Sequence, residues 1–193
     1  MQMNRRPAII LVAGAILAVL SAAVYIWLAS PDSAPVSRKG GFANYVEAKE
    51  LKPVPAVRFT DASGRVMTLE DFRGRVVVLN LWATWCTPCV AEMPTLDRLQ
   101  QQLGEEDAIV LALSIDRGGQ EAVKEFYAKT GVSYLKVFVD PTMRAQSDLG
   151  ILGLPTTLII DREGRERGRL VGPAEWDDAA AVDLVRRAMA APK

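Results

Sequence analysis

Residues 76–89 read VVVLNLWATWCTPC, and this stretch decides the fold. Its first half, Val76–Trp82, is apolar except at Asn80, which is typical of a parallel strand buried on both faces by helices. Its second half places the only two cysteines of the chain, Cys86 and Cys89, three residues apart. A helix that begins at Cys86 brings both thiols to one face, within disulfide range, and exposes the first thiol to unpaired backbone N–H groups. The pattern predicts a strand followed by a helix that carries a reactive cysteine pair.

The composition excludes several kinds of site. The 193 residues include 23 basic and 23 acidic residues, so the charge balance gives no sign of a nucleic-acid partner. The absence of histidine excludes Ser–His and Cys–His catalytic pairs and imidazole metal sites. Two cysteines without histidine also fall short of the four ligands of a structural zinc site. We therefore expect no metal and no cofactor.

The rest of the sequence alternates strand-like and helix-like segments, which predicts a mixed α/β sheet flanked by helices. Two segments ahead of the central strand, Pro55–Phe59 and Arg65–Leu69, are expected to form a β-hairpin around Asp61–Gly64. The later strands are expected at Ala108–Ile115, Lys136–Val139, Thr156–Ile160 and Arg165–Val171. The expected helices are Cys86–Leu103, Glu121–Lys129, Thr142–Leu149 and Glu175–Met189. Asp116–Gly119 is read as a connecting loop.

The N-terminal residues predict export. Ala8–Ala29 contains no charge and is long enough, at about 1.5 Å per residue, to cross a hydrocarbon core of about 30 Å. Arg5 and Arg6 precede it, so the positive-inside rule predicts a single-pass anchor with its N-terminus in the cytoplasm. A cleaved signal peptide is the alternative, although its apolar region is normally only about 7–15 residues long. Both interpretations send the remainder to an oxidising compartment.

The chain is expected to have three parts. Residues 1–29 are the cytoplasmic tip and transmembrane anchor, residues 30–54 a linker and short N-terminal extension, and residues 55–193 the folded domain. Ser30–Gly41 reads SPDSAPVSRKGG, which has the composition of a linker. Phe42–Lys52 is expected to form a short helix packed on the domain.

Cys86 is the candidate attacking thiol. A free cysteine has a pKa of about 8.5, and a helix N-terminus can lower it to between about 3.5 and 7.5, which yields thiolate near neutral pH. Cys89, one turn deeper, is the candidate resolving thiol, which would release a bound substrate by closing the internal disulfide. Thr87 and Pro88 are expected to tune the reduction potential and hold the turn. Two inert buried thiols are the alternative.

Two motifs together resemble the thioredoxin superfamily: Trp85–Cys89 (WCTPC) after the apolar strand, and Gly153–Thr157 (GLPTT). The stretch LNLWATWCTPCVAEMPTLDRL, residues 79–99, is similar to the membrane-anchored TlpA/ResA branch, and the resemblance covers roughly residues 55–189. It implies a thioredoxin-like fold with an N-terminal β-hairpin. It also implies a strand and a helix inserted after the second core strand, within Gln120–Leu149.

The same resemblance implies a substrate-binding surface beside the cysteines. Pro155 is expected to be cis and to lie against both sulfurs, which would expose the Leu154 backbone to an extended substrate segment. Trp85 is expected to pack beside the site and to form part of the docking surface, with Thr87 and Pro88 between the cysteines. Without the resemblance, Pro155 reads as a proline at the start of a strand.

Asn80 departs from thioredoxin itself, where the matching strand position holds a buried aspartate that helps to move the proton of the second thiol. An amide cannot do this. In the TlpA/ResA branch a glutamate three residues after the second cysteine is the substitute, and Glu92 occupies that position. Burial would raise its pKa above about 4.3, toward the range that suits a general base. The alternative is that Glu92 only complements the helix dipole.

The resemblance implies a membrane-anchored periplasmic thiol:disulfide oxidoreductase that reduces specific cysteine pairs. The implied substrates are apocytochrome c or copper-assembly proteins of cytochrome oxidase. A membrane thiol-transporting electron donor would recharge the pair, and residues 8–29 would contact the lipid bilayer of the inner membrane. The alternative is a Cu(I)-binding chaperone that uses Cys86 and Cys89, since thiolates bind Cu(I). A related copper carrier would be expected to have a C-x-x-x-C motif and a distant histidine, and this chain has neither.

Overall fold

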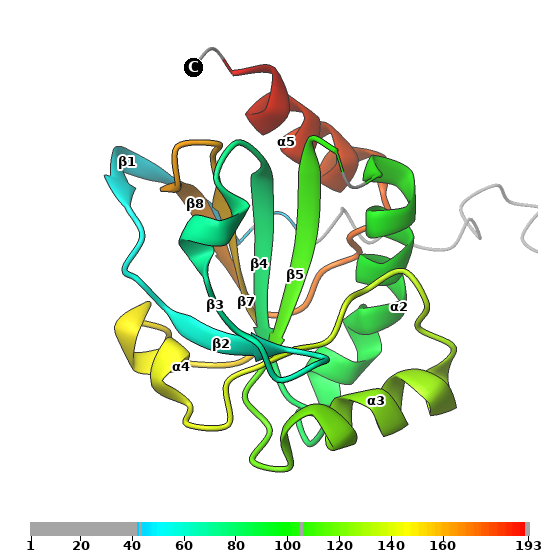
Figure 1. Ribbon diagram of the computed structural model, residues 1–193. Helices are drawn as coiled ribbons and strands as arrows, with labels where there is room; N and C mark the ends of the chain where they lie inside the picture. Colours follow the sequence, from blue (N-terminus) through cyan, green and yellow to red (C-terminus); the bar gives the residue numbers. More distant parts are fainter. Residues whose placement is uncertain (1–41, 43, 105, 192–193) are drawn as a thin grey trace, which may run out of the picture. The chain divides into compact units, whose positions relative to one another are not determined.

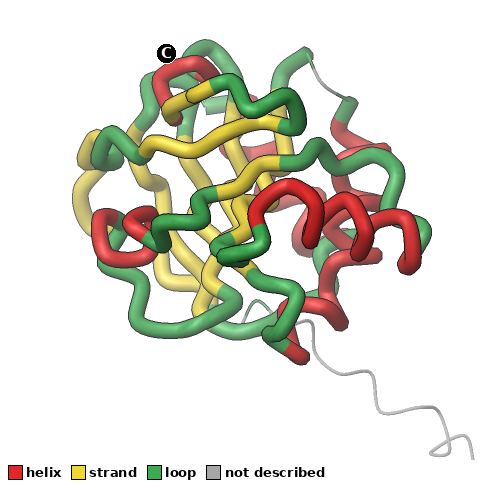
Figure 2. The backbone as a smooth tube through the Cα atoms, turned by 60° about the horizontal axis from the view of Figure 1, so that its bottom comes forward, coloured by secondary structure: helices red, strands yellow, loops and turns green. Residues whose placement is uncertain are grey.

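The computed structural model describes residues 42, 44–104 and 106–191 of the chain, and an eight-stranded sheet forms their centre (Figure 1). The strands are β1 (Tyr45–Pro53), β2 (Arg58–Asp61), β3 (Val66–Thr68), β4 (Val76–Trp82), β5 (Ala108–Ser114), β6 (Phe138–Val139), β7 (Thr156–Ile160) and β8 (Arg165–Val171). The helices are η2 (Leu69–Phe72), α2 (Thr87–Leu103), α3 (Gly119–Thr130), α4 (Arg144–Asp148) and α5 (Ala179–Ala190). Figure 2 shows the strands running side by side with helices around them.

The sheet is mixed, as the sequence predicts, and has the order β1-β8-β7-β4-β5-β6-β2-β3. Strands β4, β5 and β6 run parallel to each other, while β7 and β8 run antiparallel to their neighbours. The hairpin predicted ahead of the central strand is present as β2 and β3, although β2 begins at Arg58 rather than at Pro55 and extends to Asp61. The segment within Gln120–Leu149 holds most of α3, then β6 and α4, so the expected helix and strand are both present.

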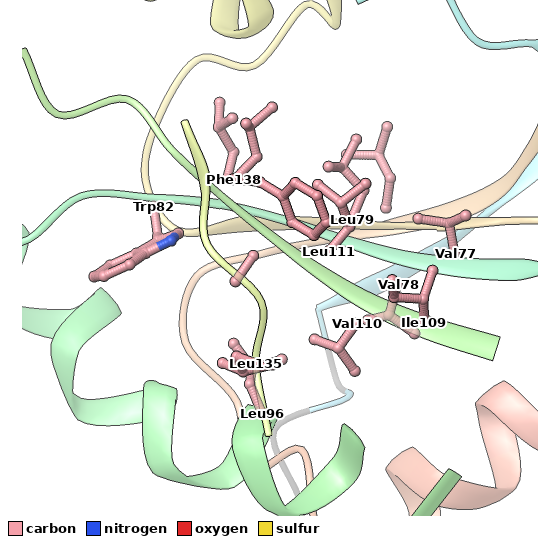
Figure 3. Close-up of a cluster of buried hydrophobic side chains, with 14 of the residues drawn as sticks. Val77, Val78, Leu79, Trp82, Leu96, Ile109, Val110, Leu111, Leu135 and Phe138 are labelled. Carbon is pink, nitrogen blue, oxygen red and sulfur yellow. The ribbon is translucent and has the colours of Figure 1, made fainter. Parts of the chain in front are cut away.

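The core lies on both faces of the two central strands, because every residue of β4 and β5 is buried. Successive side chains alternate between the faces. In Figure 3, Val110 lies on the side of the strands where Leu96 of α2 is found, while Leu79 and Leu111 lie on the other side with Phe138. The sequence of β4, apolar at every position except Asn80, thus reflects a strand covered by structure on both faces.

Two hairpin turns share one design. In the β2–β3 turn, one carboxylate oxygen of Asp61 accepts the backbone N–H groups of Ser63 and Arg65, and Gly64 has a φ of 85°. In the β7–β8 turn, Asp161 accepts the N–H groups two and four residues later in the same way, and Gly164 has a φ of 76°. A positive φ suits glycine because it lacks a Cβ. Both turns lie where the sequence predicts them.

One expected element is wrong. Phe42–Lys52 is not a helix: the segment from Tyr45 to Pro53 is strand β1, which pairs antiparallel with β8 at the edge of the sheet. The open edge of β8 offers backbone N–H and C=O groups, and pairing with them favours a strand over the expected helix. Gly168 on β8 allows the close approach, because a Cβ there would lie 2.6 Å from the carbonyl oxygen of Val46.

The last helix also begins later than expected. It starts at Ala179 rather than Glu175, because the Asp178 side chain caps it by accepting the N–H of Ala181 at 2.7 Å. Residues 172–178 therefore form a loop between β8 and α5. This loop, called here the β8–α5 loop, reaches the candidate active site.

The expected membrane anchor and the linker Ser30–Gly41 lie outside the described residues. Within residues 42, 44–104 and 106–191, no helix combines the length and apolar character that a membrane span requires.

Candidate active site

The cysteine pair lies at the start of α2, as predicted, and forms a disulfide. The Cα atoms of Cys86 and Cys89 are 5.3 Å apart. Cys86 is the N-cap residue of α2, and its carbonyl oxygen accepts the N–H of Val90 at 3.0 Å. Cys86 is 8% exposed, whereas Cys89 is fully buried. Cys86 is therefore the more accessible cysteine of the pair.

The residues around the pair present a surface to solvent. Trp85 is 63% exposed, and Thr87 and Pro88 are exposed in the first turn of α2. Proline is well tolerated in this turn because its missing N–H would have no helical partner. Trp85 thus contributes little to the core, which leaves the docking role as the remaining expectation for it.

The Leu154–Pro155 peptide bond is cis, as expected. In the antiparallel pairing of β7 with β4, Thr156 lies opposite Leu81, so Pro155 lies level with the end of β4 that leads to Cys86. Its carbonyl oxygen accepts the N–H of Gly172 at 2.9 Å. Pro155 is buried and Leu154 is partly exposed. Direct contact between Pro155 and the two sulfurs stays a prediction.

Glu92 is buried, with only 2% of its surface exposed, on the helical face that also carries Cys89. Its Oε1 accepts a hydrogen bond from Nδ2 of Asn80 at 2.7 Å. The same Nδ2 donates to Oγ1 of Thr157 on β7 at 2.9 Å. Asn80 therefore joins the central strand, its neighbour β7 and the active-site helix through one buried amide.

The second oxygen of Glu92 is held by the β8–α5 loop. Its Oε2 accepts the backbone N–H of Ala174 and the indole Nε1–H of Trp176, each at 3.1 Å. Burial raises the pKa of Glu92 from its ordinary value of 4.5 to about 7, although the bonds from Ala174, Asn80 and Trp176 act in the opposite direction. A carboxyl group with this pKa can accept or give a proton near neutral pH.

A second buried acid positions the loop before Cys86. The carboxylate of Asp116, two residues after the end of β5, accepts the backbone N–H of Thr84 at 2.9 Å and its hydroxyl at 2.7 Å. It also accepts the hydroxyl of Ser114 at 2.7 Å. Asp116 thereby fixes the chain two residues before Cys86. Read from the sequence, Asp116–Gly119 is only a connection, so this anchoring role was missed.

Sequence reasoning also missed Trp176 and Ala174. They lie 84 and 82 residues after Glu92, and no local pattern relates them to it. The available signal was a tryptophan in a polar segment, GPAEWDD, since a buried indole N–H needs an acceptor. The described residues contain no group of three or more His, Cys, Asp or Glu side chains that could hold a metal ion.

Comparison with known proteins identifies the group to which this arrangement belongs. Residues 49–185 match the Redoxin family. The chain is 32% identical over 134 residues to the thiol-disulfide oxidoreductase ResA of Bacillus thuringiensis (strain Al Hakam), which covers 69% of this chain and 76% of that protein.

Solved structures of thioredoxin-like proteins are also similar to this chain. A putative thiol:disulfide interchange protein DsbE from Chlorobium tepidum superposes with a TM-score of 0.64 at 27% identity, over 72% of this chain and 97% of that one. The exposed lipoprotein thioredoxin Etrx1 of Streptococcus pneumoniae gives a TM-score of 0.56 at 28% identity, over 69% and 99% of the two chains. The chain therefore belongs to the Redoxin family, as a ResA-like thiol:disulfide oxidoreductase of the thioredoxin superfamily.

Proposed function

We propose that this oxidoreductase is a membrane-anchored reductant of specific protein disulfides, in which Cys86 attacks, Cys89 resolves and Glu92 accepts the proton of Cys89. The observation that carries the proposal is the position of Glu92. It is buried three residues after Cys89, and its pKa is about 7. A buried acid beside the second cysteine suits a pair in which Cys86 is slightly exposed and Cys89 is fully buried.

In the first step, the Cys86 thiolate attacks one sulfur of a substrate disulfide. A bond forms between Cys86 and that sulfur, the substrate disulfide breaks, and the other substrate sulfur leaves as a thiolate. The N-terminus of α2 favours the Cys86 thiolate through its unpaired N–H groups and its dipole. The product is a mixed disulfide between Cys86 and the substrate.

In the second step, the Cys89 thiol gives its proton to the Glu92 carboxylate, and the resulting thiolate attacks the Cys86 sulfur. The Cys86–Cys89 bond forms, and the remaining substrate sulfur leaves as a thiolate that takes up a proton. Two electrons pass to the substrate, and the protein reaches the disulfide state described above. Cys89 is fully buried, so a base inside the protein is needed to deprotonate it without water.

We propose that Trp85, Thr87, Pro88, Leu154 and Pro155 bind the substrate around the Cys86 sulfur. The exposure of Trp85, Thr87 and Pro88 supports this assignment. The partly exposed Leu154, ahead of the cis bond, offers backbone groups to an extended segment. The backbone would provide affinity for any cysteine-containing segment, while Trp85 would add apolar contact area.

The proposed location is the inner membrane, with residues 1–29 as the cytoplasmic tip and anchor and residues 30–54 as linker and extension. Residues 55–193 form the periplasmic domain together with β1 of the extension, which pairs with β8. The uncharged segment Ala8–Ala29 supports this, and one similar structure is that of an exposed lipoprotein. The proposed substrates are apocytochrome c or copper-assembly proteins with cysteine pairs. A membrane thiol-transporting donor would return the electrons that each cycle consumes.

A trapping experiment tests this function. In the full-length Cys89→Ser variant the mixed disulfide on Cys86 cannot be resolved, so we expect a covalent adduct with a cysteine-pair protein of the exported compartment. The adduct is identified by mass spectrometry after cleavage with reductant. The Cys86→Ser variant is the matched control and should trap nothing. Stoichiometric Cu(I) binding by the reduced wild type, without any disulfide exchange, would support the chaperone alternative and reject the proposal.

A further inference from the structure

The β8–α5 loop is fastened to the active-site helix at two levels. The first is the pair of bonds from Ala174 and Trp176 to Oε2 of Glu92. The second is Thr95, one turn later on α2, whose Oγ1 accepts the backbone N–H of Trp176 at 3.0 Å and donates to the carbonyl oxygen of Glu92 at 2.8 Å. Trp176 is therefore bound to α2 through both its backbone and its ring.

The ring of Trp176 also packs against Phe42, which lies ahead of β1. Phe42 packs edge-on against the indole, with ring centroids 5.2 Å apart and an interplanar angle of 86°. Trp176 itself is fully buried. An aromatic pair in this geometry contributes beyond its buried area, so Phe42 restricts the orientation of the indole. Phe42 lies three residues before β1, which anchors the same segment to β8.

The two oxygens of Glu92 are not equivalent. A carboxylate oxygen has two acceptor positions. Oε2 uses both, one for Ala174 and one for Trp176, while Oε1 accepts a single bond from Asn80. Among the hydrogen bonds that the structure describes, those to Oε2 fill both of its acceptor positions, whereas one acceptor position of Oε1 stays open.

We propose that Trp176 is a positioning residue for proton transfer in this protein: its indole N–H, together with the Ala174 N–H, holds Oε2 of Glu92 and leaves Oε1 to receive the proton of Cys89. The inference rests on the proposed role of Glu92 as proton acceptor. Phe42 supports it by holding the indole in place. Phe42 thereby contributes to the geometry of the active site.

The groups around Glu92 allow the effect of losing the Trp176 hydrogen bond on the pKa of Glu92 to be predicted. Asn80 on β4 and Thr157 on β7 are neutral, Cys89 on α2 titrates once the disulfide is open, and Glu175 on the β8–α5 loop disfavours the carboxylate. Trp176 donates to the charged form and so lowers the pKa of Glu92. Loss of this donor should raise that pKa, leave less carboxylate at neutral pH and slow the second step. Alkaline conditions should restore the rate.

The test uses the full-length chain in detergent micelles and the Trp176→Phe variant, which keeps an aromatic ring beside Phe42 but removes the N–H. The pH dependence of intramolecular disulfide closure is measured by quenched-flow trapping of a mixed disulfide with a model peptide. We expect the midpoint to move upward by about one pH unit, a tenfold change in proton affinity, with the limiting rate recovered at high pH. Phe42→Leu should shift the midpoint in the same direction by less.

The matched control is Tyr134→Phe, which also removes a polar atom from an aromatic ring. Tyr134 lies on the α3–β6 connection, 45% exposed, and its hydroxyl contacts Gln101 rather than the active site. Its pH profile should equal that of the wild type. Near-ultraviolet circular dichroism checks that each variant keeps its packing. If Trp176→Phe changed the rate of disulfide closure equally at all pH values, without moving the midpoint, the role of Trp176 would be merely structural. This result would overturn the inference.

A second readout separates this inference from the proposed function. The side-chain carboxyl of Glu92 is titrated by 13C NMR, with Glu92→Gln used to assign its signal. An unchanged midpoint in Trp176→Phe, while Glu92→Gln slows disulfide closure, would overturn the role of Trp176 and leave that of Glu92 intact. A raised NMR midpoint with unchanged closure kinetics would instead overturn the role of Glu92. Raised midpoints in both measurements support the inference.

Discussion

Asn80 on β4 and Glu92 on α2 are joined by a buried hydrogen bond of 2.7 Å that runs from the amide Nδ2 to Oε1 of the carboxyl group. Both side chains are removed from solvent, with 0% and 2% exposure. The amide supplies a donor without adding a second charge. The buried bond therefore joins the carboxyl group of Glu92, whose pKa is about 7, to a neutral partner.

Asn80→Asp should destabilise the oxidised protein most strongly above neutral pH. The new carboxyl would face Oε1 of Glu92, and two carboxylates at this distance cannot both ionise without a large penalty. We expect a loss of about 3 kcal/mol in the free energy of unfolding at pH 8, and a smaller loss at pH 5, where the pair retains protons. Denaturant unfolding at both pH values measures this. Asn80→Ala lacks the bond without adding charge, so an equal pH dependence in both variants would contradict the explanation.

The stability of the oxidised wild-type protein should fall as pH rises from about 4.5 to about 7. The folded pKa of Glu92 is raised from 4.5 to about 7, so within this interval the folded state binds a proton that the unfolded state has released. The contribution of Glu92 to stability is therefore fully present below its unfolded pKa and is lost as pH rises through its folded pKa. The difference of about 2.5 units corresponds to about 3 kcal/mol. Urea titrations at intervals of half a pH unit measure the slope, and it should be absent from Glu92→Gln.

Asp116→Ala should loosen the chain that leads to Cys86. The substitution leaves the N–H and hydroxyl of Thr84 without their acceptor, at a cost of about 1–3 kcal/mol in the free energy of unfolding. Misplacement of the attacking sulfur should also slow the reaction of reduced Cys86 with a peptide disulfide, by roughly tenfold. Stopped-flow fluorescence follows this reaction. Asp107→Ala is the control, because that carboxylate is exposed and pairs with Arg162. Equal effects in the two variants would show that Asp116 has no special role.

Gly168→Ala should release strand β1 from the sheet. The added Cβ would collide with the Tyr45 hydroxyl oxygen and lie 2.6 Å from the Val46 carbonyl oxygen. Overpacking of this kind costs about 1–3 kcal/mol. We expect faster amide hydrogen exchange within residues 45–53, with little change in β4 and β5. Gly153→Ala is the control, because its Cβ would meet no atom within 4 Å. Unchanged exchange in β1 would show that β8 can shift to admit the methyl group.

Local patterns in the sequence were sufficient for most of the fold. The apolar run Val76–Trp82, the Asp-x-x-Gly turns and the spacing of Cys86 and Cys89 each act within a few residues, so their structures follow from local chemistry. Strand β1 could not be found in this way. It reads YVEAKELKP, without the alternation of apolar and polar residues that marks a half-buried strand, and only the open edge of β8 makes it a strand.

The sequence by itself determined that a cysteine pair begins a helix after a buried strand, and that an acid follows one turn later on the same helical face. Only the tertiary structure decided how that acid is held. Trp176, 84 residues from Glu92, and Asn80, on another element, meet its two oxygens because the sheet order and the β8–α5 loop bring them together. The physical reason is that the pKa of a buried carboxyl depends on burial and on donors from distant segments, and neither is encoded in its own neighbourhood of the chain.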